Sequence, residues 1–122
     1  MALAAEIMQA GISAQSARNM QGQVGTGISA AGTAIGTATR LTKTFNNVTT
    51  VAASAGVQLP VMGINESCMV YNSGVNPLTV YPPSSTVGIN QVAVGGGVTL
   101  GTNTSCTFTC FSATLIVANM SA

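Results

Sequence analysis

The stretch TSCTFTC, residues 104–110, alternates from its second position onward between hydroxyl side chains and apolar or sulfur-containing ones. Successive side chains of a β-strand point to opposite faces of a sheet. Cys106, Phe108 and Cys110 therefore share one face, which we expect to lie toward the core, with the Ser and Thr face outside. This is the clearest strand signal in the chain, and it favours an all-β fold.

The surrounding sequence, residues 38–122, keeps this character. Val, Ile, Thr, Phe and Tyr are common, and turn residues recur roughly every 8–12 positions, as in a sandwich or barrel. The runs 68–71 and 78–81 flank an Asn/Ser/Gly/Pro segment and predict a hairpin. The apolar run Ala113–Ala118 predicts a last strand that is central or covered. The expected fold is mainly β, a small antiparallel β-sandwich or jelly-roll-like barrel.

Two further elements are expected at the start of this domain. Thr39–Phe45 alternates well enough for a first strand, and Val48–Ala53 is the next apolar run. The pair Asn46-Asn47 between them predicts a turn, because Asn is enriched at turn positions.

Residues 1–21 predict an N-terminal helix, because Ala is frequent and apolar residues recur at helical spacing. An isolated helix of this length is marginal in water. Three states are open: packing on the chain's own domain, docking on a neighbouring subunit, or a disordered tail. Docking on a subunit or capsid would use the apolar face Leu3, Ile7, Met8 and Ile12.

Residues 22–37 are rich in Gly and small side chains and show no helix or strand period. We interpret them as an extended arm between the helix and the β-domain of residues 38–122. Its apolar residues Val24, Ile28 and Ile35 are further candidates for subunit or capsid contact.

Charge is scarce: Lys plus Arg number 3, Asp plus Glu number 2, and His is absent, which makes 4 % charged residues. An average soluble domain has roughly 25 %. Nucleic-acid binding needs many cations to neutralise phosphates, and acid–base catalysis needs His or paired carboxylates. We therefore expect no enzyme, no cofactor, no metal and no nucleic-acid partner. A free monomer with so little charge is expected to be poorly soluble, which favours an assembled protein.

The remaining ionic and sulfur groups allow several interpretations. Arg40 and Lys43 are expected to pair with Glu66, to meet a partner's acidic rim, or to be solvated. The odd number of cysteines predicts free buried thiols; a bridge from Cys68 to one of the other two, or a metal site, is the alternative.

No apolar run reaches the ~18–20 residues of a membrane span, and the start of the chain lacks the basic region of a secretory signal. Synthesis in a host cytoplasm is expected.

Several runs resemble a small β-module of tailed-bacteriophage virion proteins, found in head-decoration, cement and fibre proteins. The most specific is VYNSGVNPLTVYP, residues 70–82. The segments 38–60, 88–90 and 98–108 also contribute, so the similarity spans about residues 38–111. The chain departs from the module after Phe111, where it continues as strand.

The resemblance implies a structural virion role and a homotrimer. The primary hypothesis is a capsid decoration (cement) protein on the virion exterior, bound to the major capsid protein through its N-terminal helix and arm. The alternative is a fibre or receptor-binding module that contacts host glycan, and a third is another assembly protein such as a pilus-like subunit.

Overall fold

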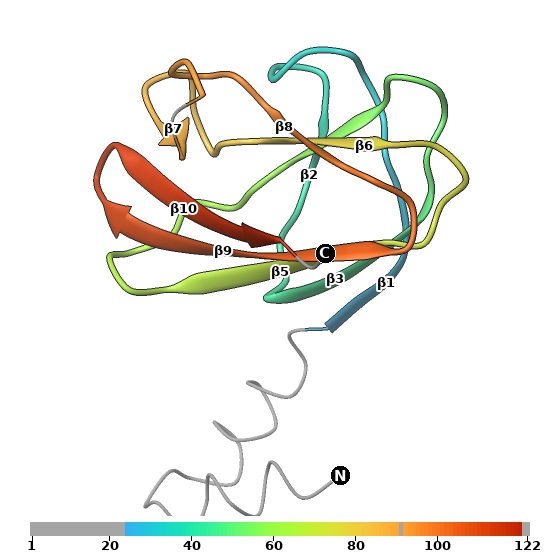
Figure 1. The fold of residues 1–122 in the computed structure, drawn as a ribbon, viewed down its shortest axis with the longest axis horizontal. Coiled ribbons are helices and arrows are strands. Elements are labelled where there is room, and N and C mark those ends of the chain that lie inside the picture. Colours follow the sequence, from blue (N-terminus) through green and yellow to red (C-terminus); the bar gives the residue numbers. More distant parts are fainter. Residues whose placement is uncertain (1–23, 91, 121–122) are drawn as a thin grey trace, which may run out of the picture.

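The structure, a computed structural model, describes residues 24–90 and 92–120, and within them it contains strands and no helix. Ten strands follow one another along the chain (Figure 1): β1 (Val24–Ser29), β2 (Thr39–Arg40), β3 (Phe45–Thr50), β4 (Gly56–Gln58), β5 (Ser67–Asn72), β6 (Leu78–Tyr81), β7 (Gly88–Ile89), β8 (Val98–Leu100), β9 (Thr104–Ser112) and β10 (Leu115–Met120).

Two facing sheets are built by a chain that passes from one to the other (Figure 1). The strands β1, β3 and β5 are neighbours in the six-stranded sheet, and β2, β4 and β6 are neighbours in the four-stranded sheet. All four pairings within these two sets are parallel. Each pair of strands therefore forms one coil stacked on the next, as in a β-solenoid.

The C-terminal part ends the stack with antiparallel strands. β8 pairs antiparallel with β6, and β9 pairs antiparallel with β5. β10 returns antiparallel along β9 and takes the short strand β7 as a parallel partner. The complete orders are β1-β3-β5-β9-β10-β7 and β2-β4-β6-β8.

The expected antiparallel sandwich or jelly-roll barrel is therefore wrong, although the fold is mainly β. The predicted hairpin of runs 68–71 and 78–81 shows why: these runs are β5 and β6, and they lie in different sheets. Period-two alternation reveals which side of a strand faces the core, but not which sheet holds that strand. An Asn/Ser/Gly/Pro connection serves as a corner between sheets here.

The first predicted strand boundaries are also wrong. Thr39–Phe45 is split between β2 and β3, and Asn46-Asn47 lies inside β3 rather than in a turn. The buried Asn46 amide is held there because its Nδ2 donates to the carbonyls of Lys43 (2.9 Å) and Met69 (3.1 Å). Such bonds offset the cost of burying a polar group in a strand.

The described part of the predicted arm, residues 24–37, packs on the β-domain as its first coil. It supplies β1 and an isolated bridge between Ala31 and Gly56. Gly27 has φ +65°, a conformation that favours glycine, and it lies where the β1–β3 register shifts. The glycines that obscure a strand period thus form a bulge. The predicted helix of residues 1–21 lies outside the described residues.

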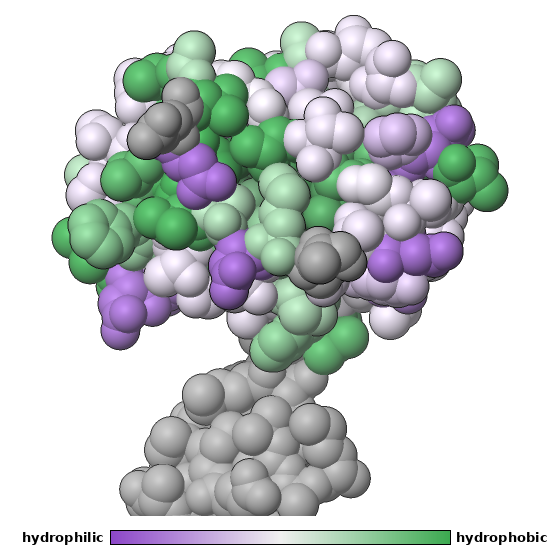
Figure 2. Space-filling model, viewed as in Figure 1, coloured by the Kyte–Doolittle hydropathy of each residue, from purple (hydrophilic) through white to green (hydrophobic). Residues whose placement is uncertain are grey.

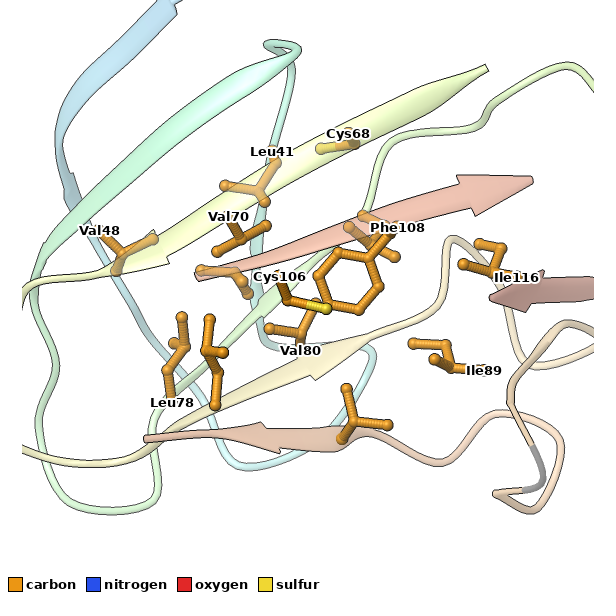
Figure 3. Close-up of a cluster of buried hydrophobic side chains, with 14 of the residues drawn as sticks. Leu41, Val48, Cys68, Val70, Leu78, Val80, Ile89, Cys106, Phe108 and Ile116 are labelled. Atoms are coloured by element: carbon orange, nitrogen blue, oxygen red, sulfur yellow. The ribbon is translucent and has the colours of Figure 1, made fainter. Parts of the chain in front are cut away.

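The space between the sheets is filled by apolar side chains from both (Figure 3). Phe108 lies at the centre with no exposed surface, and β9 buries Cys106 and Cys110 beside it. This confirms the predicted core face of residues 104–110. The last predicted strand is present with shifted bounds: β10 begins at Leu115 rather than Ala113 and lies between β9 and β7. Ile116 points into the core, whereas Val117 on the other face is 41 % exposed.

Phe108→Ala is expected to lower the free energy of unfolding by about 3–5 kcal/mol, since it removes a buried ring and leaves a cavity. Phe111→Ala, in the same strand but at a 69 % exposed position, is the matched control and should change it by about 0.5 kcal/mol or less. Urea denaturation measures both values. Equal effects of the two variants would contradict the central place of Phe108.

Candidate functional site

An apolar row crosses the outer face of the six-stranded sheet. Val24, Phe45 and Met69 are register partners on β1, β3 and β5, so their side chains follow one another on neighbouring strands. Val24 is 55 % exposed and Phe45 is 47 % exposed. Large apolar side chains at such exposure in adjacent positions are typical of contact surfaces rather than of free surface.

A second row runs beside the first and turns the surface into a groove of about 320 Å³. It contains Asn47, Tyr71 and Ser105, which are register partners on β3, β5 and β9. The Tyr71 hydroxyl donates to Asn103 Oδ1 over a long 3.5 Å. The lining residues carry no charge, so the groove, which we call the outer-face groove, favours an uncharged and largely apolar partner.

The groove depends on alternation within β3. Phe45 and Asn47 point outward, whereas Asn46 and Val48 are buried on the core side. Asn46 Nδ2 makes a third contact with Cys68 Sγ at 3.3 Å, while its Oδ1 has no partner among the described residues. One polar side chain thus anchors the strand from beneath while its neighbours form the surface.

A second apolar surface lies at the end of the stack where loops gather. Val61 and Ile64, between β4 and β5, are 80 % and 70 % exposed, and Phe111 on β9 is 69 % exposed. Backbone bonds between this loop and Cys110 hold the two segments together. Figure 2 shows hydrophobic residues gathered on the side that carries β7 and the β9–β10 turn. We call Val61, Ile64 and Phe111 the loop-end surface.

The loop-end surface borders a cavity of about 200 Å³. Its lining includes Met62, Val87, Ser112 and Ile116, and no charged residue. Both apolar surfaces use β9, because Ser105 lines the outer-face groove and Phe111 belongs to the loop-end surface, while their other residues come from different segments.

The most specific run of the resemblance, residues 70–82, serves the fold rather than the surface. Asn72 is buried; its Nδ2 donates to the carbonyls of Asn76 (2.9 Å) and Leu100 (3.0 Å), and its Oδ1 accepts from Gly74 N–H (2.9 Å). A Cβ at Gly74 would lie 2.7 Å from Val51 Cγ2, which explains the glycine. The Asn72 side chain thus provides hydrogen-bond partners for backbone groups at the corner where the chain leaves β5.

The candidate contact residues are only partly brought together. Val24 lines the outer-face groove, Ile28 turns inward and packs on the core, and Ile35 is half-buried in the turn after β1. Leu3, Ile7, Met8 and Ile12 lie outside the described residues. Sequence reasoning missed Phe45 and Met69, because a cross-strand row becomes visible only once the parallel register is known.

Of the three interpretations of Arg40 and Lys43, the pairing with Glu66 is not formed among the described residues. Arg40 donates to the carbonyls of Leu59 (3.4 Å) and Pro83 (3.2 Å), and Glu66 accepts from the Gly63 N–H. Lys43 and Glu66 line one shallow pocket without an ion pair between them. Arg40 therefore ties β2 to two connections of the four-stranded sheet.

The three cysteines are free and buried, as expected. Burial raises the pKa of the Cys68 thiol to about 12, against a smaller opposing effect of the Asn46 hydrogen bond, and raises the pKa of Cys106 to about 11. Thiols of this kind are unreactive at neutral pH. Within residues 24–90 and 92–120, no cluster of three or more His, Cys, Asp or Glu side chains could hold a metal ion.

Comparison with protein-family models, with curated proteins and with solved structures found no match to this chain. The likeness to phage β-modules thus stands on the sequence runs alone. Among the described residues, no helix has the length and apolar character to cross a membrane.

Stability is expected to fall as pH rises between about 9 and 12. The pKa of Cys68 is raised in the folded state from 9.0 to about 12, so its protonated thiol contributes fully below pH 9, and the contribution is lost as the unfolded chain releases protons. Urea midpoints between pH 8 and pH 11 measure the slope. Cys68→Ala should show a shallower decline, whereas equal slopes in both proteins would contradict the assignment.

Proposed function

We propose that this chain is a structural virion protein, a capsid decoration or cement protein that binds the outside of a phage head and stabilises contacts between capsid subunits. The observation that carries the proposal is the presence of two separate apolar surfaces, the outer-face groove and the loop-end surface, on a domain with almost no charge. From the resemblance to phage β-modules we infer that the assembly is a phage virion.

Bridging requires two contacts per subunit, and the two surfaces supply them. Phe45 and Met69 belong to the middle of the six-stranded sheet, whereas Val61 and Phe111 belong to loops and strand ends. Apolar burial gains about 25 cal/mol per Å² before ordering costs are subtracted. A subunit that buries both surfaces against two capsid subunits links them without any charged contact.

The proposed partner is the major capsid protein, and the proposed location is the virion exterior after synthesis in the host cytoplasm. The N-terminal segment, with Leu3, Ile7, Met8 and Ile12, is proposed to add a further apolar contact. The resemblance also implies a homotrimer. A decoration protein works by staying bound, and this role requires none of the titratable groups that the chain lacks.

One observation favours the alternative of a glycan-binding fibre module. The Phe45 and Tyr71 rings share the outer-face groove with Asn47, and aromatic rings beside an amide suit a sugar ring with its hydroxyls. The exposed surface of the groove is mostly apolar, however, and the loop-end surface offers no polar side chain of comparable kind. A glycan-binding fibre module is therefore the second candidate function.

Phe45→Ser and Phe111→Ser are each expected to reduce binding to capsids that lack this chain by about tenfold or more, since central aromatic contacts cost over 1 kcal/mol when removed. Co-sedimentation with such capsids measures occupancy. Val75→Ser, at an 87 % exposed position outside both surfaces, is the control and should bind normally. Full occupancy of both Phe variants, or selective binding of the native chain to a glycan array, would contradict the cement role.

Binding to capsids should also depend little on salt. Contacts between uncharged surfaces are not screened, so raising NaCl from about 0.1 M to 1 M is expected to change the affinity by less than about threefold. The same sedimentation assay measures it. A loss of a hundredfold or more would indicate charged contacts and would contradict the apolar docking proposed here.

A further inference from the structure

The end of the stack that holds β1 and β2 is hollowed. A pocket of about 220 Å³ lies there, and its lining comes from β1, from β2 and from the connection that leads to β3. β1 and β2 are end strands of their sheets, so within residues 24–90 and 92–120 no further coil covers this pocket. Folds built from stacked units need capping segments with a polar outer side, because the last unit otherwise exposes its core. The described part of the chain therefore begins with a coil that has no cap.

The pocket borders an unused hydrogen-bond acceptor. Asn46 is 2 % exposed and its Nδ2 donates to backbone carbonyls, but its Oδ1 accepts from no group among the described residues. A Cβ at Gly25 would lie 3.4 Å from this oxygen, and both residues line the pocket. The missing side chain at Gly25 thus leaves the oxygen within reach of a group in the pocket. A buried acceptor without a donor costs free energy of folding, which an entering donor recovers.

The polar side chains at this end of the stack do not supply that donor. The Arg40 guanidinium donates to two backbone carbonyls of neighbouring connections. The Thr39 hydroxyl donates to the Ser29 carbonyl at 2.8 Å. Lys43 also lines the pocket, but no hydrogen bond joins it to Asn46 Oδ1. The donor therefore has to come from outside the described residues.

The residues directly before β1 carry the groups that the pocket lacks. Residues 19–23, with the sequence NMQGQ, lead into Val24, the neighbour of Gly25, and have three side-chain amides, one Met and no charge. Amides donate hydrogen bonds, and Met fills irregular apolar space. Gly22 permits a reversal of the chain. Fully extended, the segment spans up to ~17 Å, well over the ~4.8 Å between neighbouring strands.

We propose that residues 19–23 fold back over this pocket of the same chain and cap the stack. Met20 enters the pocket beside its apolar lining residues Ile28 and Leu41. One of the side-chain amides donates to Asn46 Oδ1, and the others form the polar outer side of the cap.

The covalent link places this contact within one chain. The segment joins β1 at Val24, directly beside the pocket. A short flexible link gives an effective concentration in the mM range, which favours a chain's own pocket over that of another copy. The apolar face of Leu3, Ile7, Met8 and Ile12 lies outside residues 19–23, so the cap does not depend on the proposed function.

Paramagnetic NMR on the full chain tests the cap. A nitroxide attached to Thr42→Cys, at an exposed position in the pocket lining, is expected to broaden the amide signals of residues 19–23. Thr99→Cys is the matched control, since Thr99 is exposed on β8, at the opposite edge of the four-stranded sheet, and its nitroxide should leave these signals unchanged. The native cysteines are buried, so the nitroxide attaches to the introduced thiol.

Replacing the capping side chain gives a second readout. Met20→Ser is expected to lower the urea midpoint and to abolish the broadening, because a hydroxymethyl group does not fill the apolar part of the pocket. Met8→Ser, a methionine outside residues 19–23, is the matched control and should preserve both. Neither variant changes a residue of the β-domain.

The cap would be overturned if the nitroxide at Thr42→Cys left residues 19–23 unaffected, or if the nitroxide at Thr99→Cys broadened them equally. Equal urea midpoints of the two methionine variants would also overturn it. In a mixture of spin-labelled chain with isotope-enriched chain that carries no nitroxide, the broadening should vanish; its persistence would mean contact between copies and reject the intramolecular cap. No capsid enters these measurements, so they decide the cap separately from the decoration role.

Discussion

The stacking of one coil on the next is the constraint on which the rest of this structure depends. A single coil, such as β1 with β2, has too few apolar side chains to bury a core by itself. It becomes stable when its strands hydrogen-bond to the following coil and its inward residues pack against the opposite sheet. Parallel register then places residues of successive coils side by side, as it does for Val24, Phe45 and Met69. The surface rows and the core both follow from this register.

The corners must satisfy backbone groups that the stacked strands leave open. Asn72 does this at the turn after β5, where its side chain reaches both its own turn and the end of β8. Asn76 reaches the carbonyl of Val51 in the coil before, at 2.8 Å. Side-chain amides can both donate and accept, so one Asn links successive coils at a place where strand pairing has ended. Asn72 and Asn76 thus hold a corner of the stack.

Much of the β character was predictable from the sequence, but the topology was not. The alternation in residues 104–110 identified the core face of β9, and the run 113–118 identified β10. Alternation is a property of one strand, so it carried no information on whether β5 and β6 share a sheet. For the same reason Val24 was found as a contact candidate, whereas Phe45 and Met69, its partners on neighbouring strands, were missed. The Gly-rich segment was interpreted as an extended arm because small residues pair without leaving an apolar period.

The scarcity of charge has a structural reason once the coils are aligned. Strands in parallel register place side chains of successive coils next to one another at about 4.8 Å, and like charges at that spacing repel. Of the described charges, Lys43 lies in a connection and Glu66 directly before β5, while Arg40, on the edge strand β2, has the uncharged Gln58 as its register partner. Thr, Asn and apolar residues occupy the stacked positions instead. A surface built in this way lacks the solubility that charge provides, and the proposed contact with other subunits would bury it.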